Sequence, residues 1–176
     1  MKVLIVAYAC EQGKGSEQGP GWNLVIRLAQ KHDVTVLTRS NNQDVIEAEL
    51  SERPKLSLSF VYHDLGARFL KLKKQQTISV QLYYSLWLLS ITRRLRDENL
   101  LDEFDLVHHL TFNTFEIPPL FLGQMNALKV WGPIGGGQVP SLRLTQTLSL
   151  KDRVRESARG LRVRTSGLNP ILRRSL

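Results

Sequence analysis

The sequence predicts an α/β protein in which a Rossmann-like parallel sheet carries helices on both faces. Two observations lead to this prediction. Short apolar runs rich in β-branched residues alternate along the chain with segments of helical period, and polar or glycine-rich stretches follow the ends of those runs. Strand–helix alternation is typical of parallel sheets with crossover helices. Ligands of such sheets bind beyond the carboxyl ends of the strands, near the point where the strand order changes.

Five segments are expected to form strands. The first is a continuous apolar run, which favours a strand buried on both faces, and the second alternates between apolar and polar residues. The expected strands are residues 2–9 (KVLIVAYA), 33–39 (DVTVLTR), 56–65 (LSLSFVYHDL), 104–110 (FDLVHHL) and 127–133 (ALKVWGP).

Three longer segments between these strands have the pattern of helices: residues 22–32, residues 41–53, which begin with an asparagine cap, and residues 77–99. The apolar positions expected to face the core are Trp22, Val25, Ile26 and Ala29 in the first helix and Ile78, Leu82, Leu86 and Leu89 in the third.

The last part of the chain predicts one more helix. Ser149 to Asp152 fits a capping box, and Gly167 with the pair Asn169-Pro170 ends the helix. Its apolar side is expected to consist of Leu150, Val154, Ala158 and Leu161.

The formal net charge of +8 is concentrated in this last segment. Residues 151–176 hold eight basic and two acidic side chains, which gives +6, and residues 1–150 hold sixteen basic and fourteen acidic side chains, which gives +2. Neither stacking aromatic residues nor a nucleic-acid-binding motif accompanies the basic residues, so no nucleic-acid partner is indicated.

Cysteine content and hydropathy predict a cytoplasmic location. Cys10 is the only cysteine, which excludes an internal disulfide and favours a small buried side chain in a reducing compartment. The first residues lack the pattern of a signal peptide. The most apolar later stretch, VQLYYSLWLLSI, is shorter than the roughly 18 residues that indicate a membrane span.

A glycine-rich loop, CEQGKGSEQGPGW, follows the first strand. Its glycines permit positive φ angles and leave amides open to a ligand, and Pro20 suits the first turn of the next helix. Exposed amides at a helix start favour phosphate or carboxylate groups. The alternative is a connecting loop whose glycines serve only the turn.

Two nucleotide-binding motifs can be compared with this loop. A P-loop requires Ser or Thr directly after its lysine, and Gly15 follows Lys14 here. A dinucleotide fingerprint requires a tighter glycine spacing directly after the strand. Because the second strand ends in Arg39, which suits a 2′-phosphate, an NADP-binding oxidoreductase remains an alternative.

A pair of histidines, His108 and His109, lies near the end of the fourth expected strand. Neighbouring residues of a strand point to opposite faces, so the two rings do not ligate one metal together. We therefore expect one histidine in the core and the other at the ligand-binding edge. The alternative is two histidines with satisfied hydrogen bonds and no functional role. A second glycine loop, WGPIGGGQ, follows the fifth strand.

Taken in order, these segments resemble the amino-terminal half of family 4 glycosyltransferases. The resemblance rests on YACEQGKGSEQGPGW, VLTRSNNQ, FVYHDL, FDLVHHLTFNTFEIP and VWGPIGGGQVP, and it spans about residues 1–140. It implies the GT-B architecture, in which two Rossmann-like domains face each other across a cleft. The amino-terminal domain mainly receives the acceptor, and the carboxyl-terminal domain mainly binds the nucleotide-sugar.

The resemblance also implies roles for individual residues. His109, rather than His108, is expected to contact the transferred sugar as the catalytic histidine. The donor's diphosphate and sugar are expected at Gly13, Lys14, Gly15, Ser16, Glu17 and Gly19. The acceptor is expected at Thr111, Glu116, Gly135, Gly136, Gly137 and Gln138. The implied reaction moves a sugar from a nucleotide-sugar to a hydroxyl with retention of configuration, and it needs neither a metal nor a cofactor.

The chain departs from the family pattern at several places. Relatives favour proline at position 18 and an acid at position 138, where this sequence has Gln18 and Gln138. The paired glutamates of the donor domain, spaced E-x7-E, have no counterpart after residue 140. We therefore expect residues 1–148 to form the acceptor-side domain and residues 149–176 to form a basic helical tail leading toward a donor-binding domain, so that the chain alone is inactive.

Residues 66–74 (GARFLKLKK) mix apolar and basic side chains. Such a segment suits an anionic membrane surface, which makes a peripheral location at the inner face of the membrane an expectation. The acceptors that the family resemblance implies are glycans, lipid-linked molecules or phosphorylated molecules. A solvated loop, or a non-enzymatic membrane-binding module, is the alternative.

Overall fold

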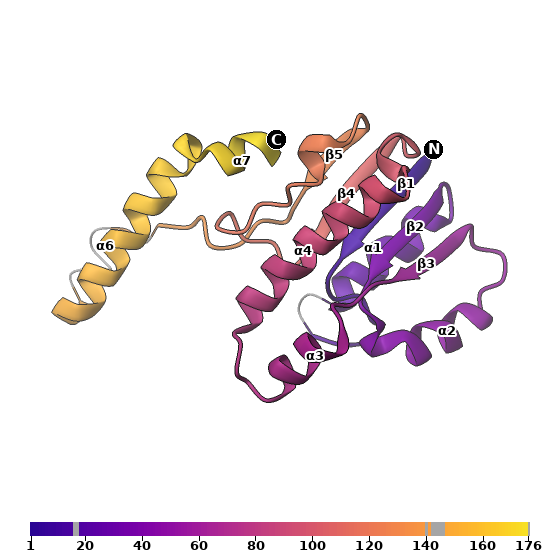
Figure 1. Cartoon of the computed structure of the whole chain (residues 1–176), viewed down its shortest axis with the longest axis horizontal. Helices are drawn as coiled ribbons and strands as arrows, with labels where there is room; N and C mark the ends of the chain where they lie inside the picture. Colours follow the sequence, from indigo (N-terminus) through magenta and orange to yellow (C-terminus); the bar gives the residue numbers. More distant parts are fainter. Residues whose placement is uncertain (16–17, 140, 142–146, 176) are drawn as a thin grey trace.

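The structure is a computed structural model that describes residues 1–15, 18–139, 141 and 147–175. Its centre is a five-stranded sheet in the order β3-β2-β1-β4-β5 (Figure 1), and all of its strand pairs are parallel. The strands are β1 (Lys2–Ala7), β2 (Asp33–Thr38), β3 (Leu58–Tyr62), β4 (Leu106–Thr111) and β5 (Leu128–Trp131). The strand order changes direction between β1 and β4, as in a Rossmann-like sheet.

The helices that the structure describes are α1 (Gln18–Ala29), α2 (Gln43–Ser51), α3 (Ala67–Lys74), α4 (Val80–Asp97), α6 (Leu150–Thr165) and α7 (Pro170–Ser175). Four short 3-10 segments are η1 (Ser40–Asn42), η2 (Leu100–Asp102), η3 (Leu122–Gln124) and η4 (Ser166–Leu168). The predicted α/β fold with a parallel sheet is confirmed. The helix α3, for which the sequence pattern assigned no element, is an addition.

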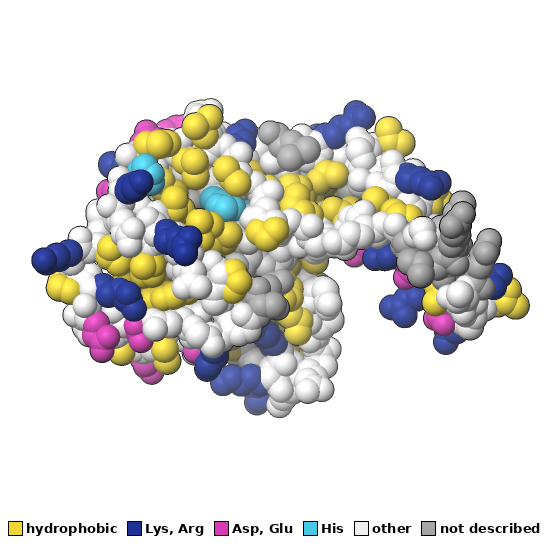
Figure 2. Space-filling view, turned by 180° about the vertical axis from the view of Figure 1, so that it is seen from behind, with side chains coloured by type: hydrophobic (Ala, Val, Ile, Leu, Met, Phe, Trp, Pro, Cys, Tyr) yellow, Lys and Arg dark blue, Asp and Glu magenta, His cyan; other side chains and the backbone are white. Residues whose placement is uncertain are grey.

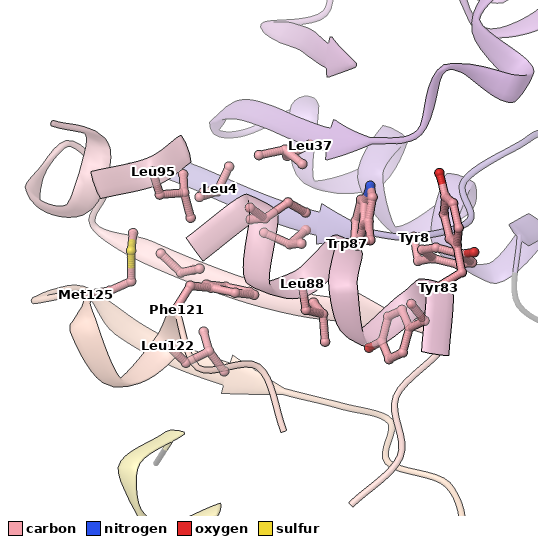
Figure 3. Close-up of a cluster of buried hydrophobic side chains, with 14 residues drawn as sticks. Leu4, Tyr8, Leu37, Tyr83, Trp87, Leu88, Leu95, Phe121, Leu122 and Met125 are labelled. Carbon is pink, nitrogen blue, oxygen red and sulfur yellow. The ribbon is translucent and has the colours of Figure 1, made fainter. Parts of the chain in front are cut away.

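Two buried clusters lie on opposite faces of the sheet. Successive strand residues point to opposite faces, so Leu4 and Val6 join the cluster beneath α4, whereas Val3 and Ile5 join the cluster beneath α1 and α2. Figure 3 shows the first cluster, in which side chains of α4 meet those of β1 and of the segment around Phe121. Helices therefore cover both faces, as predicted.

The orientation of α4 differs from the prediction. Leu82 and Leu89 of the expected stripe are about half exposed, at 48% and 46%. The buried side of the helix consists instead of Tyr83, Tyr84, Trp87, Leu88, Ile91, Thr92 and Leu95. Aromatic side chains bury more surface than leucine does, and their polar atoms find partners here, so the aromatic side faces the sheet.

The capping predictions have different outcomes. The hydroxyl of Ser149 accepts a hydrogen bond from the backbone N–H of Asp152 at 3.2 Å, as a cap requires. Asn42 occupies the cap position of α2, but its side chain makes no capping hydrogen bond. The thiol of Cys10 is buried, and this burial raises its pKa to about 12, in agreement with the expected small buried side chain.

The helix α6 extends away from the sheet (Figure 1), and its expected apolar side faces solvent. Leu150, Val154 and Leu161 are 79%, 71% and 63% exposed. After the predicted break, α7 returns to the domain, where Leu172 and Ser175 are buried. Figure 2 shows that Lys and Arg side chains are spread over several parts of the visible face rather than gathered in one patch.

Candidate functional site

A cavity of about 500 Å³ lies at the carboxyl edge of the sheet, beside the switch point between β1 and β4. It lies between the start of α1, the end of β4 and the loop after β5. Its lining residues are Pro20, Gly21, Leu24, Leu110, Thr111, Phe112, Asn113, Pro133, Ile134 and Gly135. This is the place where parallel α/β sheets bind their ligands.

Close packing at Gly21 brings α1 against β4. A Cβ at this position would lie 3.0 Å from a methyl carbon of Thr111 and 3.4 Å from the carbonyl oxygen of Ala9. The hydroxyl of Thr111 in turn accepts a hydrogen bond from the backbone N–H of Ala9 at 3.1 Å. Thr111 is buried, and it forms part of the cavity wall.

The described part of the first glycine loop has the conformation that its glycines allow. Gly13 and Gly15 have φ angles of +68° and +59°, in the left-handed region that other residues avoid. Lys14 forms an ion pair with the buried carboxylate of Glu11 at 2.9 Å. Ser16 and Glu17 lie outside the described residues. None of the other predicted donor-binding residues lines the cavity, although Gly19 precedes Pro20 of its wall directly.

The second glycine loop contributes to the cavity through Gly135. Its backbone N–H donates to the carbonyl oxygen of Asn113 at 2.9 Å, which ties the loop to the segment after β4. Gly136 has a φ angle of +82°, and a Cβ at Gly137 would meet no atom within 4 Å. The two predicted acceptor loops, after β4 and after β5, are therefore adjacent.

Two predicted acceptor residues lie elsewhere. Glu116 does not line the cavity and forms an ion pair with Arg162 of α6 at 3.0 Å. Gln138 is exposed and also lies outside the cavity wall.

Asn113 is a cavity residue that the sequence pattern did not single out. Its side-chain nitrogen donates to the carbonyl oxygen of His109 at 2.9 Å, and its side-chain oxygen is buried without a hydrogen-bond partner in the described structure. An unpartnered buried acceptor is rare and favours a ligand donor. The signal available in the sequence was its place two residues after the end of β4.

His109 lies at the end of β4 as predicted, but its side chain is completely buried. Its Nδ1–H donates to the carbonyl oxygen of Val6 at 3.1 Å, so Nε2 accepts from the hydroxyl of Tyr84 at 2.6 Å. Burial lowers the pKa of His109 to about 3. The imidazole is therefore neutral, and the expected direct contact with a sugar is not available in this conformation.

His108 is only partly buried and does not line the cavity. Its Nε2–H donates to the carbonyl oxygen of Gly132 at 2.8 Å, which holds the start of the second glycine loop. Burial lowers the pKa of His108, and the hydrogen bond to Gly132 opposes this shift. Figure 2 shows histidine side chains at the surface of the face in view.

Phe112 has a strained backbone at the cavity wall. Its φ angle of +63° is rare for a bulky residue, and such angles cluster at functional sites. Its ring lies 4.9 Å from the ring of Tyr8 and 4.9 Å from that of Tyr84. The strained residue thus connects the cavity to the aromatic core that holds His109.

Comparisons of the chain with protein-family models, with curated proteins and with solved structures found no match. The class that the structure itself defines is a Rossmann-like α/β protein with a ligand-sized cavity at the switch point. Within the described residues, no three His, Cys, Asp or Glu side chains come together as a metal site. No helix in that part of the chain is both long and apolar enough to cross a bilayer.

Proposed function

We propose that the chain is the acceptor-side domain of a retaining GT-B glycosyltransferase, which transfers a sugar from a nucleotide-sugar to a hydroxyl. The cavity at the switch point carries the proposal, because it brings the segment after β4 and the second glycine loop to one wall. Its unpartnered Asn113 oxygen suits a sugar hydroxyl, and its apolar wall suits the face of a sugar ring.

The first glycine loop is the proposed contact for the donor diphosphate. The start of α1 favours an anion, and Lys14 could add a charge after leaving Glu11. The backbone N–H of Gly19 donates to the carbonyl oxygen of Lys14 at 2.7 Å, so it would also have to change its partner. The nucleotide itself would bind to a second domain, so this chain alone should neither hydrolyse nor transfer a nucleotide-sugar. The buried His109 then acts by positioning the end of β4 through Tyr84 and Val6.

The NADP alternative has less support. Residues 8–17 separate β1 from α1, whereas a dinucleotide fingerprint makes this connection a tight turn. An NADP-binding oxidoreductase would be distinguished by tight binding of NADP⁺ to this chain alone.

The proposal can be tested by NMR titration of the labelled chain with a set of monosaccharides and with UDP-glucose. We expect monosaccharides to shift the amide signals of Thr111, Asn113 and Gly135, and the nucleotide-sugar to bind in the millimolar range, on the order of −4 kcal/mol. Asn113→Ala should weaken the sugar shifts, whereas Gln138→Ala, outside the cavity, should not. Micromolar binding of UDP-glucose would contradict the division between the two domains, and absence of any sugar shift would contradict the acceptor role.

A further inference from the structure

A second group of polar side chains gathers at the carboxyl edge of β1, β2 and β3, outside the cavity. Arg39 follows β2, Tyr8 follows β1, and Lys73 is near the end of α3. The Lys73 ammonium donates to the Tyr8 hydroxyl at 2.9 Å and lies 4.5 Å from the centre of the Tyr83 ring. The guanidinium carbon of Arg39 lies 4.6 Å from the centre of the Tyr8 ring. Figure 3 shows Tyr8 and Tyr83 together at one end of the aromatic cluster.

The charges of this group do not balance. Asp64 is the only carboxylate that forms an ion pair with either cation in the described part of the chain, and its Oδ1 lies 3.5 Å from Nε of Arg39. Its Oδ2 is already used, because it accepts from the backbone N–H and the hydroxyl of Ser40. Its Oδ1 also accepts from the hydroxyl of Tyr83 at 3.4 Å. The hydrogen-bond partner of Lys73 is a neutral hydroxyl, so two cations stand beside one carboxylate.

The charged side chains of this group are partly buried. The Arg39 and Asp64 side chains are 14% and 12% exposed, and Lys73 is half-buried. Burial, with Arg39 adding to it, lowers the pKa of Lys73 to about 8, although Asp64 opposes this shift. Because the attraction between opposite charges grows as water is excluded, an anion that reached Arg39 and Lys73 would bind more strongly than at an exposed pair.

We propose that Arg39, Lys73 and the hydroxyl of Tyr8 bind a phosphate group of the acceptor substrate. A guanidinium, an ammonium and a hydroxyl are the donors that phosphate oxygens use in proteins. The ring of Tyr8 also contacts Phe112, which lines the cavity. The contact between Tyr8 and Phe112 would therefore link a phosphate bound by the cluster to a hydroxyl bound in the cavity. The acceptor class rests on the proposed function, whereas the phosphate site does not.

The experiment is an NMR titration of the 176-residue chain with glycerol 1-phosphate, and with glycerol plus sodium chloride at equal ionic strength as the reference. We expect glycerol 1-phosphate to shift the signals of Tyr8, Arg39 and Lys73. The reference titration with glycerol and sodium chloride should leave these signals unchanged. Lys73→Gln should weaken this binding about tenfold, because it removes a charged hydrogen bond. The matched control is Lys71→Gln, which removes the same charge from an exposed position of the same helix and should change binding less than twofold.

Arg39→Lys provides a second variant that keeps the charge and removes the planar fork, and it should also weaken binding. Equal binding by the wild type, Lys73→Gln and Lys71→Gln would overturn the site, as would absence of binding to both glycerol 1-phosphate and vesicles containing phosphatidic acid. Vesicle binding that depends on Lys73 without binding of glycerol 1-phosphate would assign the same site to a lipid headgroup. Micromolar NADP⁺ binding that is lost in Lys73→Gln would support the phosphate site and overturn the proposed glycosyltransferase.

Discussion

The hydroxyl of Tyr84 in α4 donates to Nε2 of His109 in β4 at 2.6 Å, inside a core that water does not reach. The other ring nitrogen of His109 is fixed by the carbonyl oxygen of Val6 in β1. One buried side chain thus connects a helix and two neighbouring strands at the edge where the cavity opens. The stability of this connection can be measured separately from any activity.

Removing the Tyr84 hydroxyl should destabilise the domain. In Tyr84→Phe, Nε2 of His109 would remain buried without a donor, which costs about 1–3 kcal/mol. Tyr62→Phe makes the same chemical change where the hydroxyl donates to Glu47 in an exposed position, and it should cost less. Urea unfolding of both variants gives the comparison. An equal loss in the two variants would contradict the buried role of Tyr84.

The protonation of His109 predicts that stability decreases in acid. Its pKa is lowered to about 3 in the folded chain, against an ordinary value near 6.5, so the unfolded state binds more protons between these pH values. The contribution is therefore complete above pH 6.5 and is lost as pH falls toward 3, by at most about 1.4 kcal/mol for each pH unit.

The measurement is the free energy of unfolding at pH 7 and pH 5 for the wild type and for His109→Gln. Burial also lowers the pKa values of His63 and His108, so the variant should keep part of the pH dependence. We expect the difference between the two pH values to be smaller in His109→Gln than in the wild type. The same difference in both proteins would indicate that His109 gains access to water.

Adjacent leucines of α4 provide a test of how this helix faces the sheet. Leu88 is 3% exposed, and Leu89 is 46% exposed. Leu88→Ala should lower the free energy of unfolding by about 2–5 kcal/mol, the usual range for a buried leucine. Leu89→Ala should lower it by clearly less, since about half of its side chain already contacts water. Chemical denaturation of the two variants decides between the observed orientation and the one that the leucine spacing predicted.

The contrast on α4 illustrates what the sequence could predict. The continuous apolar run of β1 and the alternating run of β2 identify these strands from local sequence alone. On α4, the leucine spacing competed with Tyr83, Tyr84 and Trp87, whose polar atoms make burial costly unless they find partners. Those partners, His109 for Tyr84 and the carbonyl oxygen of His63 for Trp87, come from distant parts of the chain.

The site was predictable to a similar degree. The order of strands and glycine loops indicated the edge of the sheet at which the cavity lies, because carboxyl ends of parallel strands share one edge. Local sequence could not assign the partners of single side chains there. Glu116 forms an ion pair with Arg162, and Asn113 lines the cavity. Both positions depend on the tertiary arrangement of the segments that follow β4, which local sequence does not specify.

A substitution at Gly123 should release the last helix. A Cβ at this position of η3 would overlap the carbonyl group of Arg174 in α7, and backbone atoms cannot move aside cheaply. Gly123→Ala should therefore increase hydrogen exchange in α7 while β1 and β4 remain protected. Gly66→Ala is the control, because a Cβ there meets no atom within 4 Å. Unchanged exchange in α7 would show that the contact is not maintained in solution.

The conformation of Gly15 should matter both for stability and for the proposed donor contact. Its φ angle of +59° costs roughly 1–2 kcal/mol for a residue with a Cβ, and a β-branched side chain is the least suited. Gly15→Val should therefore destabilise the chain modestly, whereas Gly15→Asn should be tolerated better, because asparagine adopts this conformation more readily. Gly137→Val serves as the control, since a Cβ at Gly137 has open space and no positive φ angle.

Melting temperatures of the chain and donor kinetics of the proposed two-domain enzyme then separate two roles of the loop. If the left-handed conformation is what donor binding requires, Gly15→Val should raise the donor KM while Gly15→Asn should leave it close to the wild-type value. If the donor's phosphates approach the bare backbone, both variants should raise it, because either side chain occupies the space. A donor KM unchanged in both variants would mean that the loop only connects β1 to α1.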